Sequence, residues 1–141
     1  MAPVLEHVLI CEDIRLEINN KITLVGVYGR YLFLARDAKF PGRLPQLCLF
    51  TRWLGIQGGE KVFLGLEYEG EVLLKPGEPN VAPNPNVATD YAQLSFMLPG
   101  FVLKGFGDYR FRISLNDAEN VINEFVLSIQ PQPSPPIPSR K

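Results

Sequence analysis

The chain is poor in the residues that usually build catalytic and metal centres. It contains one histidine, His7, and two cysteines, Cys11 and Cys48. A serine or cysteine nucleophile would depend on His7, which lies in the middle of a predicted strand rather than on a loop. No G-x-x-x-x-G-K-S/T and no G-x-G-x-x-G motif is present to bind phosphates or dinucleotides. These absences predict a protein that is not an enzyme and needs no cofactor.

Concentrated positive charge and long apolar runs are also lacking. The 15 acids and 14 bases leave a net charge of −1, and the longest run of basic residues is the final pair. Nucleic acid binding needs a basic footprint, so no nucleic acid partner is expected. No apolar run approaches the roughly 18 residues of a membrane-spanning helix, and MAPVLEHVLI lacks the basic start of an export signal. The expectation is a cytoplasmic protein with no membrane span and with reduced cysteines.

Metal binding finds little support in the spacing of the possible ligands. In a strand, His7 and Cys11 share a face but lie about 13 Å apart, too far to hold one metal ion. In a helix the same spacing would suit zinc, but no capping residues flank this segment. Acids predicted on loops could gather around calcium, although no D-x-D-x-D-G loop is present. Cys11 and Cys48 are therefore interpreted as small buried apolar residues, with no metal bound.

Strand signals dominate the chain, and turn residues separate them. With 46% apolar residues, one two-layer core is feasible. This pattern predicts an all-β fold, an antiparallel β-sandwich of about eight strands that is immunoglobulin-like or C2-like. The predicted strands are Val4–Glu12, Ile22–Tyr28, Gln46–Leu54, Val62–Glu69, Tyr91–Leu98, Phe101–Lys104, Tyr109–Leu115 and Val121–Ile129, with a further short candidate near Leu32.

The segment DYRFRISLN predicts its own pairing. Apolar and polar residues alternate in it without exception, so one face is buried and the other is solvated. If Leu115 pairs with Val121 on the next strand, Arg112 lies opposite Glu124 on the solvated face. The sequence therefore predicts a cross-strand ion pair between Arg112 and Glu124.

Tyr109 follows Gly107 in a G-x-Y pattern at the start of the same strand. Immunoglobulin-like sandwiches place a tyrosine here whose hydroxyl bonds to the backbone a few residues upstream. The alternative is an ordinary strand aromatic with its hydroxyl at the rim of the core.

The chain is predicted to form a single domain at residues 1–130. Two segments are predicted to form no strand, one inside this domain and one after it. Residues 76–90, PGEPNVAPNPNVATD, are expected to form a long surface loop. Residues 131–141, PQPSPPIPSRK, are expected to be a disordered, polyproline-like tail. The tail matches the P-x-x-P-x-R pattern that aromatic grooves bind, while a solvated chain end explains the same composition.

Several runs together carry a resemblance to a known family. They are VLICEDIRLEINNKITLVGVYG, KFPGRLPQLCLFTRW, GGEKVFLGLEYEGEVL, GDYRFRISLND and EFVLSIQP. In this succession the chain resembles a family of small, uncharacterised bacterial proteins, over nearly its whole length up to the proline-rich tail. The resemblance implies a compact β-sandwich domain of unknown function and supplies no catalytic residues. The Pro/Asn loop and the tail depart from the family pattern.

The function that these observations favour is a non-enzymatic protein-interaction or scaffold module, with an unknown protein partner or a second copy of itself. Apolar residues beside glycines are the candidates for the interaction surface: Trp53, Leu54, Ile56, Phe101, Val102 and Leu103. The alternative is a small-ligand or carbohydrate binder that uses aromatics on one sheet face: Tyr28, Tyr31, Trp53 and Tyr68. An enzyme is the least favoured function.

Overall fold

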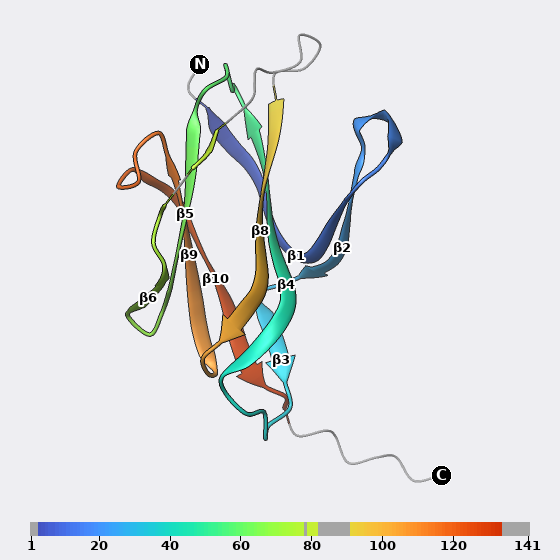
Figure 1. Ribbon diagram of the computed structural model, residues 1–141, viewed down its shortest axis with the longest axis vertical. Helices are drawn as coiled ribbons and strands as arrows, with labels where there is room; N and C mark the ends of the chain where they lie inside the picture. Colours follow the sequence, from blue (N-terminus) through green and yellow to red (C-terminus); the bar gives the residue numbers. More distant parts are fainter. Residues whose placement is uncertain (1–2, 78, 82–90, 134–141) are drawn as a thin grey trace.

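The computed structural model describes residues 3–77, 79–81 and 91–133, and in them the fold is all-β (Figure 1). A short 3-10 turn, η1 (Ile18–Asn20), joins the first two strands. No helix in this part of the chain is long and apolar enough to cross a membrane. The strands are β1 (Val4–Leu16), β2 (Ile22–Tyr28), β3 (Tyr31–Leu34), β4 (Gly42–Leu54), β5 (Lys61–Tyr68), β6 (Glu71–Leu74), β7 (Asn80–Val81), β8 (Tyr91–Leu103), β9 (Gly107–Leu115) and β10 (Val121–Pro131).

The strands form two sheets. The first has the order β2-β1-β4-β8, and the second has the order β3-β10-β9-β5-β6 with β7 also beside β5. The prediction of an all-β fold is confirmed, and so is the short strand near Leu32, which is β3. The prediction of purely antiparallel pairing is wrong, because β3 pairs with β10 in parallel. Gly29 and Arg30 connect β2 in the first sheet to β3 at the edge of the second sheet. β3 therefore runs in the same direction as β10.

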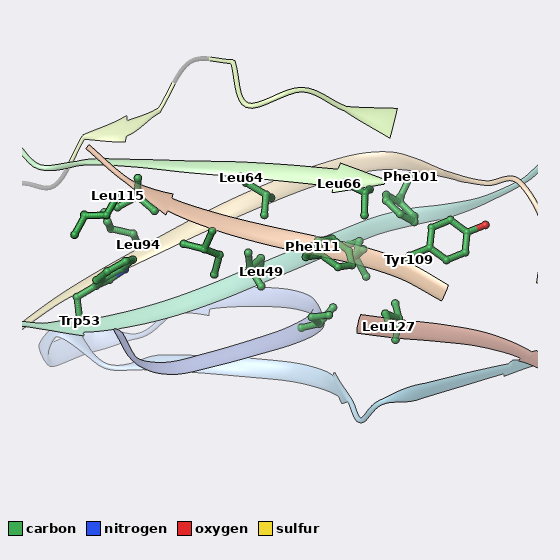
Figure 2. Packing of buried hydrophobic residues seen from close by; sticks show 14 of the residues in the cluster. Leu49, Trp53, Leu64, Leu66, Leu94, Phe101, Tyr109, Phe111, Leu115 and Leu127 are labelled. Carbon is green, nitrogen blue, oxygen red and sulfur yellow. The ribbon is translucent and has the colours of Figure 1, made fainter. Parts of the chain in front are cut away.

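The hydrophobic core lies between the inner faces of the two sheets (Figure 2). Leu49 and Leu94 contribute from the first sheet, and Leu64 and Phe111 contribute from the second. The prediction that the polar members of DYRFRISLN are all solvated is wrong at Ser114, which is 1% exposed. The burial predicted for its apolar members is confirmed. Those members are Tyr109, Phe111, Ile113 and Leu115.

The predicted ion pair between β9 and β10 is confirmed. Arg112 and Glu124 are register partners, and Arg112 Nε lies 2.7 Å from Glu124 Oε2. The predicted pairing of Leu115 with Val121 is wrong, because Val121 pairs with Ser114. A β-bulge directly after Val121 adds one residue to β10 and displaces the register only near the turn.

Several strands exceed their predicted bounds. β8 runs unbroken through the Pro99-Gly100 pair that was expected to end it, and β6 was not predicted at all. β7 lies inside the segment expected to be a loop, and residues 82–90 lie outside the described residues. Pro131, expected to begin the tail, pairs with Leu34 on β3. The remainder of the tail, from residue 134, also lies outside the described residues.

The hydroxyl of Tyr109 closes the turn before β9. It donates a hydrogen bond to the carbonyl of Gly105 at 2.8 Å, and it accepts from the backbone N–H groups of Lys104 at 2.8 Å and Gly105 at 3.1 Å. The side chain is fully buried, and its ring stacks on Tyr68 at a centroid distance of 4.5 Å. The upstream backbone contact predicted for this tyrosine is confirmed, and a hydroxyl left at the rim is excluded.

We expect Tyr109→Phe to lower the free energy of unfolding by about 1–3 kcal/mol, because three backbone groups lose their partner while the ring stays in place. Urea unfolding measures the change. Tyr31→Phe is the matched control, since that side chain is 52% exposed, and it should change stability by less than about 0.5 kcal/mol. Equal losses of unfolding free energy in the two variants would contradict a stabilising role of the Tyr109 hydroxyl in the turn.

Candidate functional site

Four of the six residues predicted to form an interaction surface lie in the core instead. The exposed fraction is 0% for Trp53, 3% for Ile56, 8% for Phe101 and 3% for Leu103. Their predicted exposure is therefore wrong. The other two residues, Leu54 and Val102, are half-buried.

Backbone geometry explains these burials. Trp53 shares the inward face of β4 with Leu49, and its indole N–H donates to the Thr51 hydroxyl at 2.9 Å. Gly100 has a left-handed backbone with φ of +61°, which lets β8 continue and turns Phe101 into the core. Figure 2 places Trp53 and Phe101 toward opposite ends of the core, so the predicted residues do not form one surface.

The aromatic residues proposed to bind a ligand are also dispersed. Tyr28 and Trp53 belong to the first sheet, whereas Tyr31 and Tyr68 belong to the second. Trp53 is enclosed, and Tyr68 donates its hydroxyl to the carbonyl of Phe106 at 2.6 Å. These four side chains therefore build no common stacking platform.

His7 lies on β1 with a half-exposed side chain. Its Nε2 is 3.6 Å from Glu6 Oε1. Within the described ranges, no three His, Cys, Asp or Glu side chains come together in a way that could hold a metal ion.

The end of the β1–β2 hairpin stands away from both sheets (Figure 1). β1 pairs with β4 only as far as the Cys11–Cys48 pair, and beyond it β2 is the one described strand that pairs with β1. β2 has β1 as its sole neighbour in the described sheet. Residues 13–25, here called the arm, therefore form a two-stranded ribbon without a sheet behind it.

One face of the arm is apolar. Ile14 pairs with Leu24 and Leu16 pairs with Ile22, which places all four side chains on one face of the ribbon. Ile18 follows at the tip. Within the residues that the structure describes, none of these five belongs to the core or packs against it. Leu16 is 85% exposed and Ile18 is 80% exposed.

Two pairs of polar side chains elsewhere on the arm contact each other. The Thr23 hydroxyl donates to Glu17 Oε2 at 2.8 Å, and Arg15 Nε lies 3.7 Å from Asp13 Oδ2. Asn19 supplies the left-handed backbone of the turn, with φ of +62°. The arm is therefore an amphipathic hairpin, and β1 runs to Leu16 instead of ending at Glu12 as predicted.

Gly26 and Glu12 mark the root of the arm. They face each other between the Cys11–Val27 and Asp13–Val25 pairs. Gly26 has φ of +63°, and a Cβ there would lie 2.7 Å from Cδ of Glu12. The backbone conformation of the root therefore favours glycine, and a Cβ there would also force the exposed Glu12 side chain to move.

A second candidate site is an apolar cleft between β6 and β8, the facing edges of the two sheets. Its volume is about 560 Å³. The lining includes Leu66, Val72, Met97, Phe101 and Val102. The Glu71–Lys104 ion pair, 2.8 Å between Oε2 and Nζ, also borders the cleft.

Sequence reasoning missed both the arm and the cleft. The signal for the arm is IRLEINNKITL, in which aliphatic residues alternate with polar ones on both sides of the turn. The signal for the cleft is EVLL, a four-residue strand too short to stand out.

Residues 6–128 match the model of one protein family, which is described as a family of unknown function (DUF6941). The matched region contains the arm, the cleft and nearly every strand. No curated protein matches the chain.

We expect Gly26→Ala to destabilise the protein more than Gly70→Ala does. Both glycines have positive φ, so each alanine costs about 1–2 kcal/mol in backbone strain. Only at Gly26 does the new Cβ also displace Glu12, because nothing lies within 4 Å of a Cβ at Gly70. Urea unfolding gives the global change and hydrogen exchange locates it, with faster exchange expected in the arm. Equal losses of stability in both variants would show that the contact with Glu12 does not contribute to the effect of Gly26→Ala.

Proposed function

Because the chain belongs to DUF6941, a family of unknown function, its role has to be inferred from its own geometry, and we propose a non-enzymatic protein-interaction or scaffold module. We place it in the bacterial cytoplasm. The observation that carries this proposal is the arm, an ordered hairpin whose apolar face contacts nothing in the described core.

The energetics of the arm favour a partner. Complete burial of a leucine or isoleucine contributes about 1.5–3 kcal/mol, and the arm leaves five such residues outside the core. A two-stranded hairpin without further packing is marginally stable in water. A protein that covered the apolar face would therefore stabilise the arm while binding to it.

A second copy of the chain is the partner that fits best. The arm carries two acids, Asp13 and Glu17, and two bases, Arg15 and Lys21, so two arms meet without net repulsion. β2 is an edge strand, and two copies related by a twofold axis can pair β2 with β2 through the same surface. An interface made by the arms is small, so the dimer should dissociate on dilution.

The finer architecture that we propose is an immunoglobulin-like or C2-like β-sandwich. The Tyr109 hydroxyl bound to the backbone of Lys104 and Gly105 supports the immunoglobulin-like form, since such domains use a tyrosine in this way. The fully buried Trp53 fits the same pattern.

A small-ligand role is the second candidate, and the cleft between β6 and β8 favours it. Its volume of about 560 Å³ lies within the range of ligand pockets, and its lining is mainly aliphatic. Lys104 at its border can attract an anion. The ligand class that fits is an apolar chain ending in a carboxylate, rather than a carbohydrate that needs a stacking platform.

For the arm, we expect the wild-type chain to form a concentration-dependent dimer. Replacing both Leu16 and Ile18 with Asp should weaken dimerisation by about tenfold or more. Stability should change by less than about 0.5 kcal/mol, because both side chains are exposed. Sedimentation equilibrium measures the association, and Val121→Asp, at a 45% exposed valine on the other sheet, should dimerise normally. A wild-type chain that stays monomeric at every soluble concentration would overturn self-association.

For the cleft, we expect the wild-type chain to bind dodecanoate in a calorimetric titration. Val102→Trp should abolish binding by filling the cleft, whereas Val27→Trp, at a 49% exposed valine outside it, should leave binding unchanged. Lys104→Met should weaken binding by about tenfold through loss of the charged contact. No heat of binding from the wild-type chain would remove the ligand role.

A further inference from the structure

Cys11 and Cys48 lie directly opposite each other in the last residue pair that joins β1 to β4. Both are free thiols. Opposed residues on antiparallel strands have Cα atoms about 4.5–5.5 Å apart, which lies within the range of disulfides, about 4.4–6.8 Å. The fold therefore holds the two cysteines at bonding separation, although 36 residues intervene in the sequence.

The two thiols lie on the outer face of the first sheet. Their chain neighbours Ile10 and Leu47 belong to the core, whereas Cys11 and Cys48 do not. The strands on either side place Val27 and Met97 opposite the two cysteines, and these side chains are 49% and 46% exposed. The sulfur atoms have no exposed area, yet a shell of surface side chains covers them rather than the core.

Gln46 belongs to this shell of surface side chains and contacts the sulfur atom of Cys48. Its Nε2 donates to Cys48 Sγ at 3.4 Å. The same side chain lines a surface hollow of about 830 Å³ at the root of the arm, together with Glu12, Asp13 and Tyr28. Rotation of the Gln46 side chain would open a path from this hollow to Cys48.

We propose that Cys11 and Cys48 form a reversible disulfide that fastens the root of the arm to β4. With hydrogen peroxide as oxidant, the Cys48 thiolate attacks one oxygen, which leaves a sulfenic acid and hydroxide. The Cys11 thiolate then attacks that sulfur, forms the S–S bond and releases the second hydroxide. The two thiol protons convert both hydroxides to water, and a dithiol reductant restores the thiols.

The surroundings of the pair set its rate of oxidation. Burial, followed by the neighbouring Cys48 thiol, raises the pKa of Cys11 to about 11, and a hydrogen bond with the backbone of Asp13 opposes this shift. Burial also raises the pKa of Cys48, and the hydrogen bond from Gln46 opposes this shift. Tyr28 on β2 pairs with Ile10, the chain neighbour of Cys11, and burial raises the pKa of Tyr28, so its hydroxyl is neutral at pH 7. Thiolate is therefore scarce at neutral pH, and oxidation should quicken about tenfold per pH unit.

The bond would change the connection between the arm and the sheets. In the reduced chain, Cys48 Sγ lies 3.7 Å from the carbonyl oxygen of Glu12 as a weak donor, and Gln46 Nε2 reaches Asp13 Oδ1 at 3.1 Å. A disulfide replaces the weak sulfur contact with a covalent link one residue before Glu12. It would hold β1 against β4 at the point where β1 leaves the sheet.

The test uses the full chain, treated with hydrogen peroxide and then alkylated with iodoacetamide. We expect no alkylation, a mass lower by two hydrogen atoms, and a tryptic pair linking residues 1–15 to residues 44–52. Dithiothreitol should restore both thiols, and the rate should rise about tenfold from pH 7 to pH 8.

Cys11→Ser and Cys48→Ser are the matched controls, and each should give oxidised or alkylated single thiols without an internal link. The proposal is overturned if the wild-type thiols oxidise independently to sulfinic acids, stay open to alkylation, or link only between molecules. Because the measurement uses a monomeric mass and not dimerisation, its failure leaves the arm proposal untouched.

Discussion

The pairing of β1 with β4, and the point at which it ends, is the constraint on which the rest of this structure depends. The pairing directs Val8 and Ile10 inward and leaves Cys11 on the outer face opposite Cys48. Beyond this pair β4 no longer follows β1 and instead pairs with β8 alone. Among the described strands, the second half of β1 pairs with β2 alone, so it leaves the sheets as the arm. The core, the cysteine pair and the arm all follow from one register.

The molecule separates its apolar residues into a covered set and an uncovered set. Two inner sheet faces cover the first set, and the buried Tyr109 hydroxyl holds the turn at one end of that core. The second set lies at sheet edges. It consists of the apolar face of the arm, which includes the edge strand β2, and of the cleft between the edge strands β6 and β8. Edge strands offer unpaired backbone groups as well as apolar surface, so recognition is expected there. The outer face of the second sheet differs, because Arg112 bridges Glu67 and Glu124 across three strands.

The alternation of apolar and polar residues predicted those features that depend on neighbours along the chain. Alternation in DYRFRISLN identified the apolar residues of β9 that are buried, and it placed Arg112 opposite Glu124. Patterning failed for Trp53 and Phe101, which were expected at the surface because glycines lie beside them. The burial of Phe101 depends on the φ of Gly100 and on continued pairing with β4, neither of which a single strand reveals. The bulge after Val121 escaped prediction for the same reason.

The sequence by itself determined the all-β class, the scarcity of residues for a catalytic centre, and the amphipathic character of the strands. These properties follow from residue types and from the two-residue period of a strand. Only the tertiary structure decided which amphipathic segment is covered and which is not. IRLEINNKITL alternates like a strand that packs on a core, yet its apolar face contacts no core in the described part of the chain, because the pairing of β1 with β4 ends at Cys11 and Cys48. Sheet pairing joins residues distant in the chain, so it also brought Cys11 to Cys48 and left the arm free.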